Sequence, residues 1–145
     1  MRLRLSLCVD PGRPWRDVLA LARQADRDGW HGVYVCDHLM PPDEAGRPAC
    51  GPVLECWTVP AALASQTTAV RLGSLVLGNT YRHPAVVANM AATLDLIGGG
   101  RLVLGIGAGW QPNKHAAWRL LASHPGSRPQ VGNNRRSLVD HRGRA

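Results

Sequence analysis

Apolar residues along the chain follow two alternating patterns. Short, mostly apolar runs of strand length lie at 3–9, 32–36, 72–77 and 101–106. Between them, apolar residues recur at helical spacing from Trp15 to Asp28, from Thr58 to about Thr68 and from Pro84 to Ile97. A further helix is predicted at 113–122. The pattern therefore predicts strands and helices in strict alternation.

The predicted helix ends carry recognisable signals. Gly29 and the run Gly98–Gly100 follow the first and third helices, where glycine commonly ends a helix. Pro60 limits where the regular part of the second helix can begin, and Thr58, two residues earlier, is its predicted cap.

This order predicts an α/β fold in which helices cover a parallel sheet, because continuous apolar strands are buried on both faces. Two architectures fit: an open doubly wound sheet or part of a (β/α)8 barrel. In both, chemistry gathers at the carboxyl ends of the strands. Those ends lie at Asp10, Asp37–His38, Gly78–Asn79 and Gly107–Ala108–Gly109.

Residues that could take part in a reaction or bind a ligand lie at these strand ends. A carboxylate beside an imidazole, as in Asp37–His38, could orient the ring or tune its proton affinity; alternatively, Asp37 caps the next loop and His38 packs. The glycines of 105–109 form GxGxG rather than GxGxxG, which disfavours a dinucleotide site but suits close approach to a flat or phosphorylated ligand. Asn79 and Asn113 could bind a ligand or close turns.

The composition indicates what class of protein this is. The chain has 145 residues, 45% of them hydrophobic and 19% charged, which fits one folded domain. It has neither a long apolar run nor a secretory pattern, so we expect a cytoplasmic protein. Cys8 and Cys36 lie in apolar runs and are expected to be small core residues. A metal site built from Cys50, Cys56 and His38 is not favoured by their spacing, so none is predicted.

The positive charge lies near the C-terminus. Residues 1–113 carry ten Arg and nine acidic residues, whereas 114–145 carries seven basic residues and only Asp140. We expect a folded body at 1–122 and a disordered basic tail at 123–145, because the tail is too polar to bury a core. It lacks the aromatic residues of a nucleic-acid stacking surface, so no specific nucleic-acid partner is predicted. Its composition is also what a frameshift in a GC-rich gene would produce.

Several segments together resemble a known family. They are GVYVCDHL at 32–39, LECW at 54–57, RLGSLV at 71–76, GNTYRHPA at 78–85, GGRL at 99–102 and GAGWQ at 107–111. In this order and spacing they resemble the luciferase-like monooxygenase superfamily, most closely its coenzyme-F420-dependent oxidoreductases. The likeness covers about residues 3–118.

The resemblance implies that the chain is the N-terminal half of a (β/α)8 TIM barrel whose strand ends hold a flavin or deazaflavin ring. It implies that His38 is catalytic, contacting the ring near its reacting carbon, and that Asp37 supports it. A bulge with a non-prolyl cis peptide is expected near Ser74–Leu75–Val76, behind the ring. The implied cofactor-binding residues are Asp37, His38, Ser74, Leu75, Val76, Asn79, Gly107, Gly109 and Asn113.

The implied reaction is hydride transfer between reduced coenzyme F420 and an organic substrate, with an FMN-dependent monooxygenase as the alternative. The chain departs from the family at Trp110, where some members carry a carboxylate, and at Lys114, where an acid is usual. A full barrel needs about 250 residues, whereas this chain has 145 and is expected to form only four βα units. We therefore predict that its gene is truncated or frameshifted. We expect weak coenzyme binding and self-association through open sheet edges. A non-catalytic half-barrel remnant remains a second hypothesis.

Overall fold

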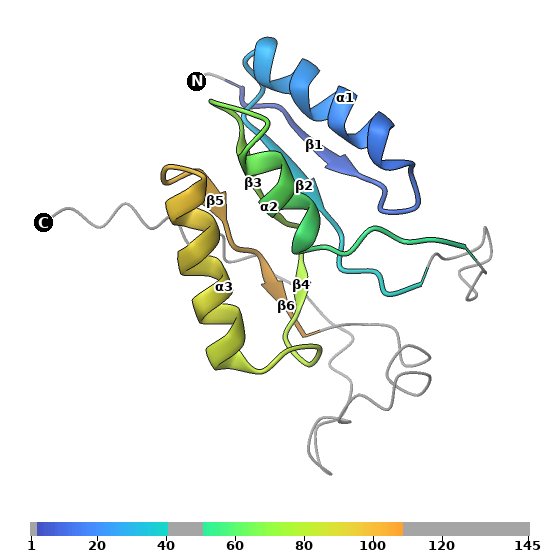
Figure 1. Ribbon diagram of the computed structural model, residues 1–145, viewed down its shortest axis with the longest axis vertical. Helices are drawn as coiled ribbons and strands as arrows, with labels where there is room; N and C mark the ends of the chain where they lie inside the picture. The colour runs from blue at the N-terminus through green and yellow to red at the C-terminus, as the bar shows by residue number, and fades with distance from the viewer. Residues whose placement is uncertain (1–2, 41–50, 109–145) are drawn as a thin grey trace, which may run out of the picture.

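The computed structural model describes residues 3–40 and 51–108 (Figure 1). The predicted helix at 113–122 and the predicted tail lie outside these residues. The elements, in chain order, are β1 (Ser6–Val9), α1 (Trp15–Arg27), β2 (Gly32–Val35), α2 (Thr58–Ala64), β3 (Arg71–Ser74), β4 (Leu77–Gly78), α3 (Pro84–Ile97), β5 (Leu102–Val103) and β6 (Ile106–Gly107).

The strands form a parallel sheet, as the sequence predicts. Four of them pair in the order β1-β2-β3-β5, and β4 pairs with β6 beyond them. β3 and β4 are two pieces of the predicted strand 72–77, and β5 and β6 are two pieces of the predicted strand 101–106. The expected bulge is present, because Leu75 and Val76 separate β3 from β4 and are joined by a cis peptide bond.

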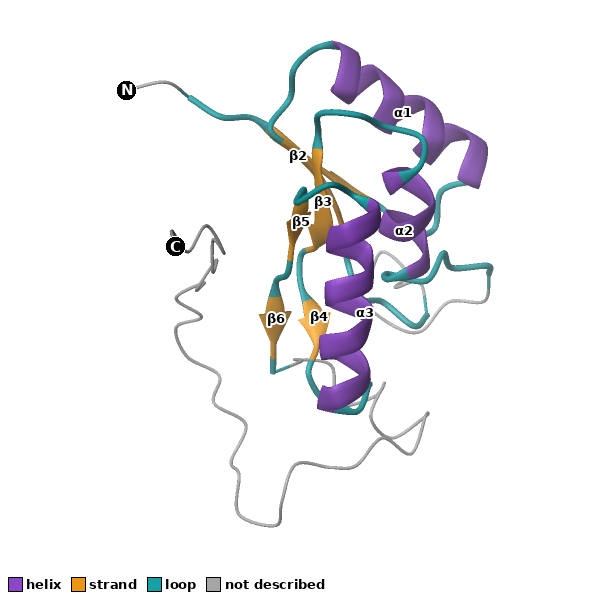
Figure 2. Ribbon diagram, turned by 60° about the vertical axis from the view of Figure 1, so that its left-hand side comes forward, coloured by secondary structure: helices purple, strands orange, loops and turns teal. Residues whose placement is uncertain are grey.

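Helices α1, α2 and α3 lie on one side of the sheet (Figure 2). Because strand side chains alternate between faces, Val33 and Val35 of β2 are buried in the hydrophobic core, whereas Tyr34 and Cys36 turn to the other face and are partly exposed. In α1, Val18, Ala22 and Ala25 line the face turned to this core. Within the described residues, none of the helices is long and apolar enough to span a bilayer.

One arginine joins two helices to the sheet. Arg101, just before β5, donates from Nε to the carbonyl of Gly98, which follows α3, at 2.6 Å. Its Nη1 and Nη2 reach Ala64 at the end of α2 and Thr67 and Val70 in the next loop, at 2.8–3.0 Å. Carbonyl groups at a helix end lack partners within the helix, so this guanidinium supplies hydrogen bonds that the backbone cannot.

The loop between α2 and β3 is also bound from the opposite side. The carboxylate of Asp26 in α1 accepts the backbone N–H groups of Thr68, Ala69 and Val70 at 2.7–2.9 Å. Burial acts to raise the pKa of Asp26, but these hydrogen bonds and one from the Thr68 hydroxyl outweigh it and lower that pKa to about 2. The ionised form of Asp26 is therefore the one that these loop hydrogen bonds favour.

Three expectations for local structure were wrong. α2 ends at Ala64 rather than near Thr68, because Asp26 and Arg101 bind the backbone groups that a longer helix would have paired internally. Thr58 is not the cap of α2; the carboxylate of Glu55 takes that role. Cys8 is exposed and Cys36 partly exposed, because both lie on the sheet face that the helices leave uncovered.

Candidate functional site

The carboxyl ends of β2, β4 and β6 lie close together, at the end of the sheet where these strands stop; this end is called the carboxyl edge below. The backbone N–H of Gly78 donates to Oδ2 of Asp37 at 2.9 Å, and that of Asn79 donates to the carbonyl of Gly107 at 2.9 Å. His38 follows Asp37 directly. The structure thus brings together Asp37, His38, Asn79 and Gly107, which the sequence placed at separate strand ends.

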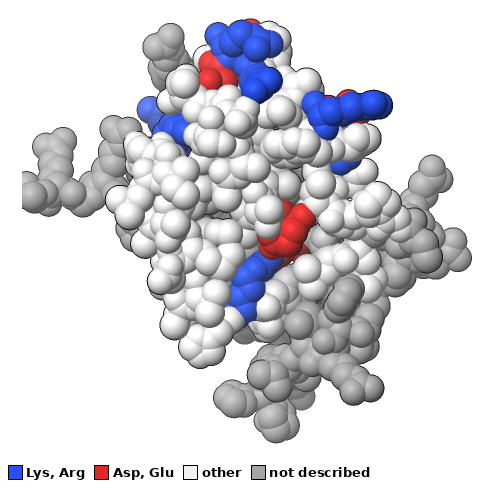
Figure 3. Space-filling model, viewed as in Figure 1, with Lys and Arg blue, Asp and Glu red and all other residues white. Residues whose placement is uncertain are grey.

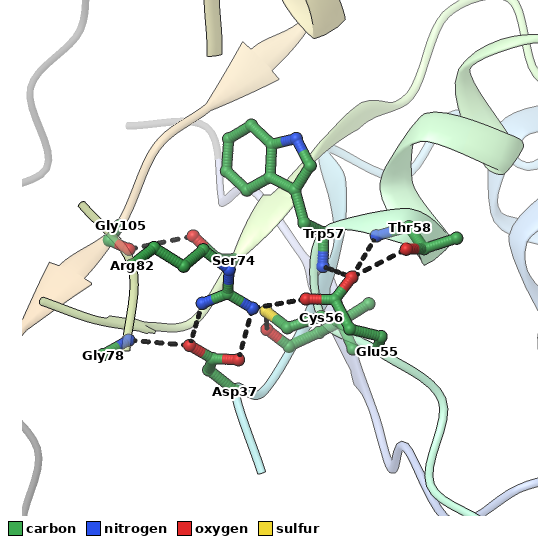
Figure 4. Close-up of polar contacts among 10 residues, drawn as sticks. Asp37, Glu55, Cys56, Trp57, Thr58, Ser74, Gly78, Arg82 and Gly105 are labelled. Carbon is green, nitrogen blue, oxygen red and sulfur yellow. Dashed lines mark hydrogen bonds and ion pairs between the residues drawn. The ribbon is translucent and has the colours of Figure 1, made fainter. Parts of the chain in front are cut away.

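Arg82 binds the buried carboxylate of Asp37 at this edge (Figure 4). Its Nη1 lies 2.7 Å from Oδ2 and its Nη2 lies 3.1 Å from Oδ1. Nη2 also contacts Oε1 of Glu55. The Asp37 side chain is 2% exposed and that of Arg82 is 15% exposed, so most of this ion pair is removed from water. Burial acts to lower the pKa of Arg82, but the two carboxylates raise it, so Arg82 stays charged.

Glu55 connects this ion pair to the start of α2. Its Oε2 accepts the backbone N–H groups of Trp57 and Thr58 and the Thr58 hydroxyl at 2.6–2.9 Å. Burial acts to raise the pKa of Glu55, but the hydrogen bonds from Thr58 and Arg82 outweigh it and lower that pKa. Arg82, Asp37 and Glu55 therefore join the ends of β2 and β4 to the first turn of α2.

The bulge after β3 packs against the glycines of the predicted GxGxG run. A Cβ atom added to Gly107 would lie 2.6 Å from Cγ2 of Val76, and one added to Gly105 would lie 2.5 Å from the carbonyl oxygen of Ser74. Ser74 is buried, and its hydroxyl donates to the carbonyl of Gly105 at 2.8 Å. The bulge therefore leaves no room for a side chain at Gly105 or Gly107.

Leu75, another predicted site residue, is half-buried, and its backbone N–H donates to the carbonyl of Val35 at 2.9 Å. Val76 is 37% exposed and Asn79 is exposed, so their side chains reach solvent at the edge that carries His38. Gly109 and Asn113 lie outside the described residues. Among the residues that the structure describes, no three His, Cys, Asp or Glu side chains come together to hold a metal ion.

Sequence reasoning missed Arg82 and Glu55, although a signal was present. Arg82 is the only charged residue between 72 and 94, and Glu55 is the only one between 51 and 70. Figure 3 shows the result: charged side chains gather toward the end of the molecule where α1 lies, and below them one adjacent pair of opposite charges interrupts a largely uncharged surface. An isolated charge in an apolar segment near a strand end is a reason to look for a buried partner.

Comparison with known proteins identifies the family. The family described as luciferase-like monooxygenase matches residues 4–128. The chain belongs to this family. It is 41% identical over 100 residues to an F420-dependent glucose-6-phosphate dehydrogenase of Beutenbergia cavernae, a match covering 68% of this chain and 29% of that protein.

Solved structures agree with this family. Monooxygenase RslO1 of Streptomyces bottropensis matches with a TM-score of 0.70 and 28% identity, over 81% of this chain and 37% of that one. The oxygenating constituent of 3,6-diketocamphane monooxygenase from Pseudomonas putida, solved with FMN, matches with a TM-score of 0.65 and 25% identity, over 80% and 32%. The chain thus spans about a third of the length of these luciferase-like proteins, consistent with the predicted partial TIM barrel.

Proposed function

We propose that the chain supplies the ring-binding part of a coenzyme-F420-dependent oxidoreductase that transfers a hydride between the reduced coenzyme and an organic substrate. The observation that carries this proposal is the meeting of the β2, β4 and β6 carboxyl ends, with His38, Asn79 and Gly107, at one edge of a luciferase-like sheet. The similarity to an F420-dependent glucose-6-phosphate dehydrogenase supports the choice of coenzyme.

The side chains at this edge fit a flat ring with polar borders. Val76 offers a partly exposed apolar surface, and Gly107 beside it has no side chain to obstruct a ring. The exposed amide of Asn79 can donate and accept hydrogen bonds. FMN has a ring of similar shape, and the related diketocamphane monooxygenase was solved with FMN, so FMN is the alternative coenzyme.

The residues take different roles in this proposal. When bound, the coenzyme supplies the hydride chemistry, and the protein supplies position and exclusion of water. His38 is the proposed catalytic residue, in contact with the ring. Asp37 is a positioning residue, because its carboxylate binds Arg82 and Gly78 and fixes the backbone on which His38 sits. Gly109 and Asn113 are proposed to extend the site.

Titration with each coenzyme tests the proposal. We expect saturable quenching of F420 fluorescence on addition of the chain, with affinity weaker than micromolar because only part of the barrel is present, and a smaller response with FMN. His38→Ala should reduce the F420 response. The matched control is His31→Ala, because His31 directly precedes β2 and so lies at the amino-terminal end of the strand, away from His38.

The outcomes separate the alternatives. A response to FMN alone would replace F420 with FMN as the coenzyme. No response to either coenzyme would favour a non-catalytic half-barrel remnant. Equal responses from the His38→Ala and His31→Ala variants would remove His38 from the site while leaving the coenzyme in place.

A further inference from the structure

Two thiols face each other across the first two strands. The Sγ atoms of Cys8 in β1 and Cys36, directly after β2, lie 3.4 Å apart. Cys8 pairs with Tyr34 in the strand register, and Cys36 follows Tyr34 by two residues, just past the end of β2. Because side chains on one face recur every second residue, both sulfurs lie on the sheet face that the helices leave uncovered. We propose that Cys8 and Cys36 form an oxidation-sensitive dithiol, which hydroperoxides convert into a disulfide joining β1 to β2.

The proposed reaction is balanced by the peroxide. The thiolate of Cys36 attacks one peroxide oxygen, giving a sulfenic acid on Cys36 and releasing the other oxygen as water or an alcohol. The sulfur of Cys8 then attacks the Cys36 sulfur, forming the S–S bond, and the hydroxyl group of the sulfenic acid leaves with the Cys8 proton as water. Two thiols lose two hydrogens and two electrons, and the hydroperoxide accepts them.

The order of attack follows from the contact between the sulfurs. The hydrogen bond with Cys36 is the largest effect on the pKa of Cys8 and raises it, and burial adds to the increase. Either sulfur can donate in this contact, and in the proposed reaction Cys8 is the one that keeps its proton. This makes Cys36 the attacking sulfur and Cys8 the sulfur that resolves the sulfenic acid.

The position of β1 allows the sulfurs to close. A disulfide needs the sulfurs about 2.05 Å apart, so they must approach from their present contact distance. β1 lies at the end of the sheet and, among the described residues, pairs only with β2, so it can shift without breaking a second ladder. Cys36, the attacking sulfur, is partly exposed and lies beside the exposed Cys8, which gives a peroxide access. Since Cys36 precedes Asp37, the new bond would lie one residue from the ion pair with Arg82.

Peptide mapping of the oxidised chain tests this proposal without any coenzyme. The native chain is treated with hydrogen peroxide, blocked with N-ethylmaleimide and digested with trypsin and a glutamate-specific protease. Glu44 and Glu55 then separate Cys36 from Cys50 and Cys56. We expect one cross-linked pair of peptides, carrying Cys8 and Cys36 and lighter by two hydrogens. When the chain is oxidised in urea, the Cys8–Cys36 pair should form no more often than the other pairs of cysteines.

Two variants make the outcome decisive. Cys8→Ser should give no such cross-link, and its Cys36 sulfenic acid should be trapped by dimedone. Cys8→Ser combined with Ser6→Cys returns a thiol to the same strand and face but two residues from its place; it should restore little cross-linking. A wild-type chain that forms no Cys8–Cys36 bond, or forms it no more often native than in urea, would overturn the proposal. Equal cross-linking of the relocated thiol would do the same.

Discussion

Arg82 and Asp37 form a two-point ion pair across 45 residues of sequence, with both Nη atoms of the guanidinium on the two carboxylate oxygens. The pair lies where β2 and β4 end, within the proposed site. Asp37 also accepts the N–H of Gly78, so its charge is balanced by one cation and one backbone donor. A carboxylate this deeply buried is costly once its partner is removed.

Arg82→Met should destabilise the chain strongly. It leaves the Asp37 carboxylate buried without its cation, a change that typically costs about 3–5 kcal/mol of unfolding free energy. Arg82→Lys keeps the charge but not the two parallel hydrogen bonds, so its loss should be smaller. Urea unfolding followed by circular dichroism measures both. A Met variant as stable as the Lys variant would show that the ion pair does not hold these strand ends.

Acid should weaken the loop that Asp26 binds. The pKa of Asp26 in the folded chain is lowered to about 2, below the ordinary value near 3.8. The contribution of Asp26 to stability is therefore present above about pH 4 and is lost as the pH falls toward 2. Asp26→Ala should cost about 1–2 kcal/mol at neutral pH, as for the loss of a capping carboxylate. Unfolding midpoints measured from pH 5 to pH 2 test this, with Asp17→Ala on the same helix as the control. Wild type and Asp26→Ala with identical acid profiles would contradict it.

The sequence pattern predicted the parallel sheet because its signals are local. Runs such as 32–36 show their burial in consecutive residues, and Pro84 and Gly98 mark the limits of α3. The end of α2 could not be found in this way, because it depends on Asp26 and Arg101, which lie about 40 residues away on either side. Glu55, Arg82 and the contact of Cys8 with Cys36 are likewise tertiary relationships. Residue type suggested chemistry at His38, but only the folded chain shows that Asp37 binds Arg82.

Arg101 should stabilise the fold more through the shape of its guanidinium group than through its charge. Its planar guanidinium serves five oxygen contacts at once, on Ala64, Thr67, Val70 and Gly98. Arg101→Lys can satisfy at most three of them, because an ammonium group has three donors and a different geometry. We expect a loss of about 2–3 kcal/mol, measured by urea unfolding. Arg23→Lys, which replaces an exposed arginine on α1, is the matched control, and equal stabilities of the two variants would refute this role.

Val76 and Gly107 should show strong energetic coupling. Gly107→Ala places a Cβ 2.6 Å from Cγ2 of Val76, so one of the two must move. Overpacking of this kind typically costs about 1–3 kcal/mol. Val76→Ala removes the obstructing methyl groups, so Gly107→Ala should cost much less in a Val76→Ala background. A double-mutant cycle on unfolding free energy measures the difference. Additive effects would show that the glycine is not required by Val76.

Self-association should proceed through the sheet edges rather than through α3. β1 and β5 lie at the two ends of the main sheet in the described part of the chain, and an open edge can pair with another chain. We expect the sedimentation coefficient of the protein to rise with concentration. Ser6→Lys, on exposed β1, should reduce this rise, because charged side chains discourage edge pairing.

The competing surface is the exposed side of α3, where Leu96 is 83% exposed. Leu96→Lys places the same charge on that surface and leaves both edge strands unchanged. If the edges make the contact, this variant should associate like the wild type in sedimentation velocity. If Leu96→Lys prevents association and Ser6→Lys does not, the contact lies on the helical face.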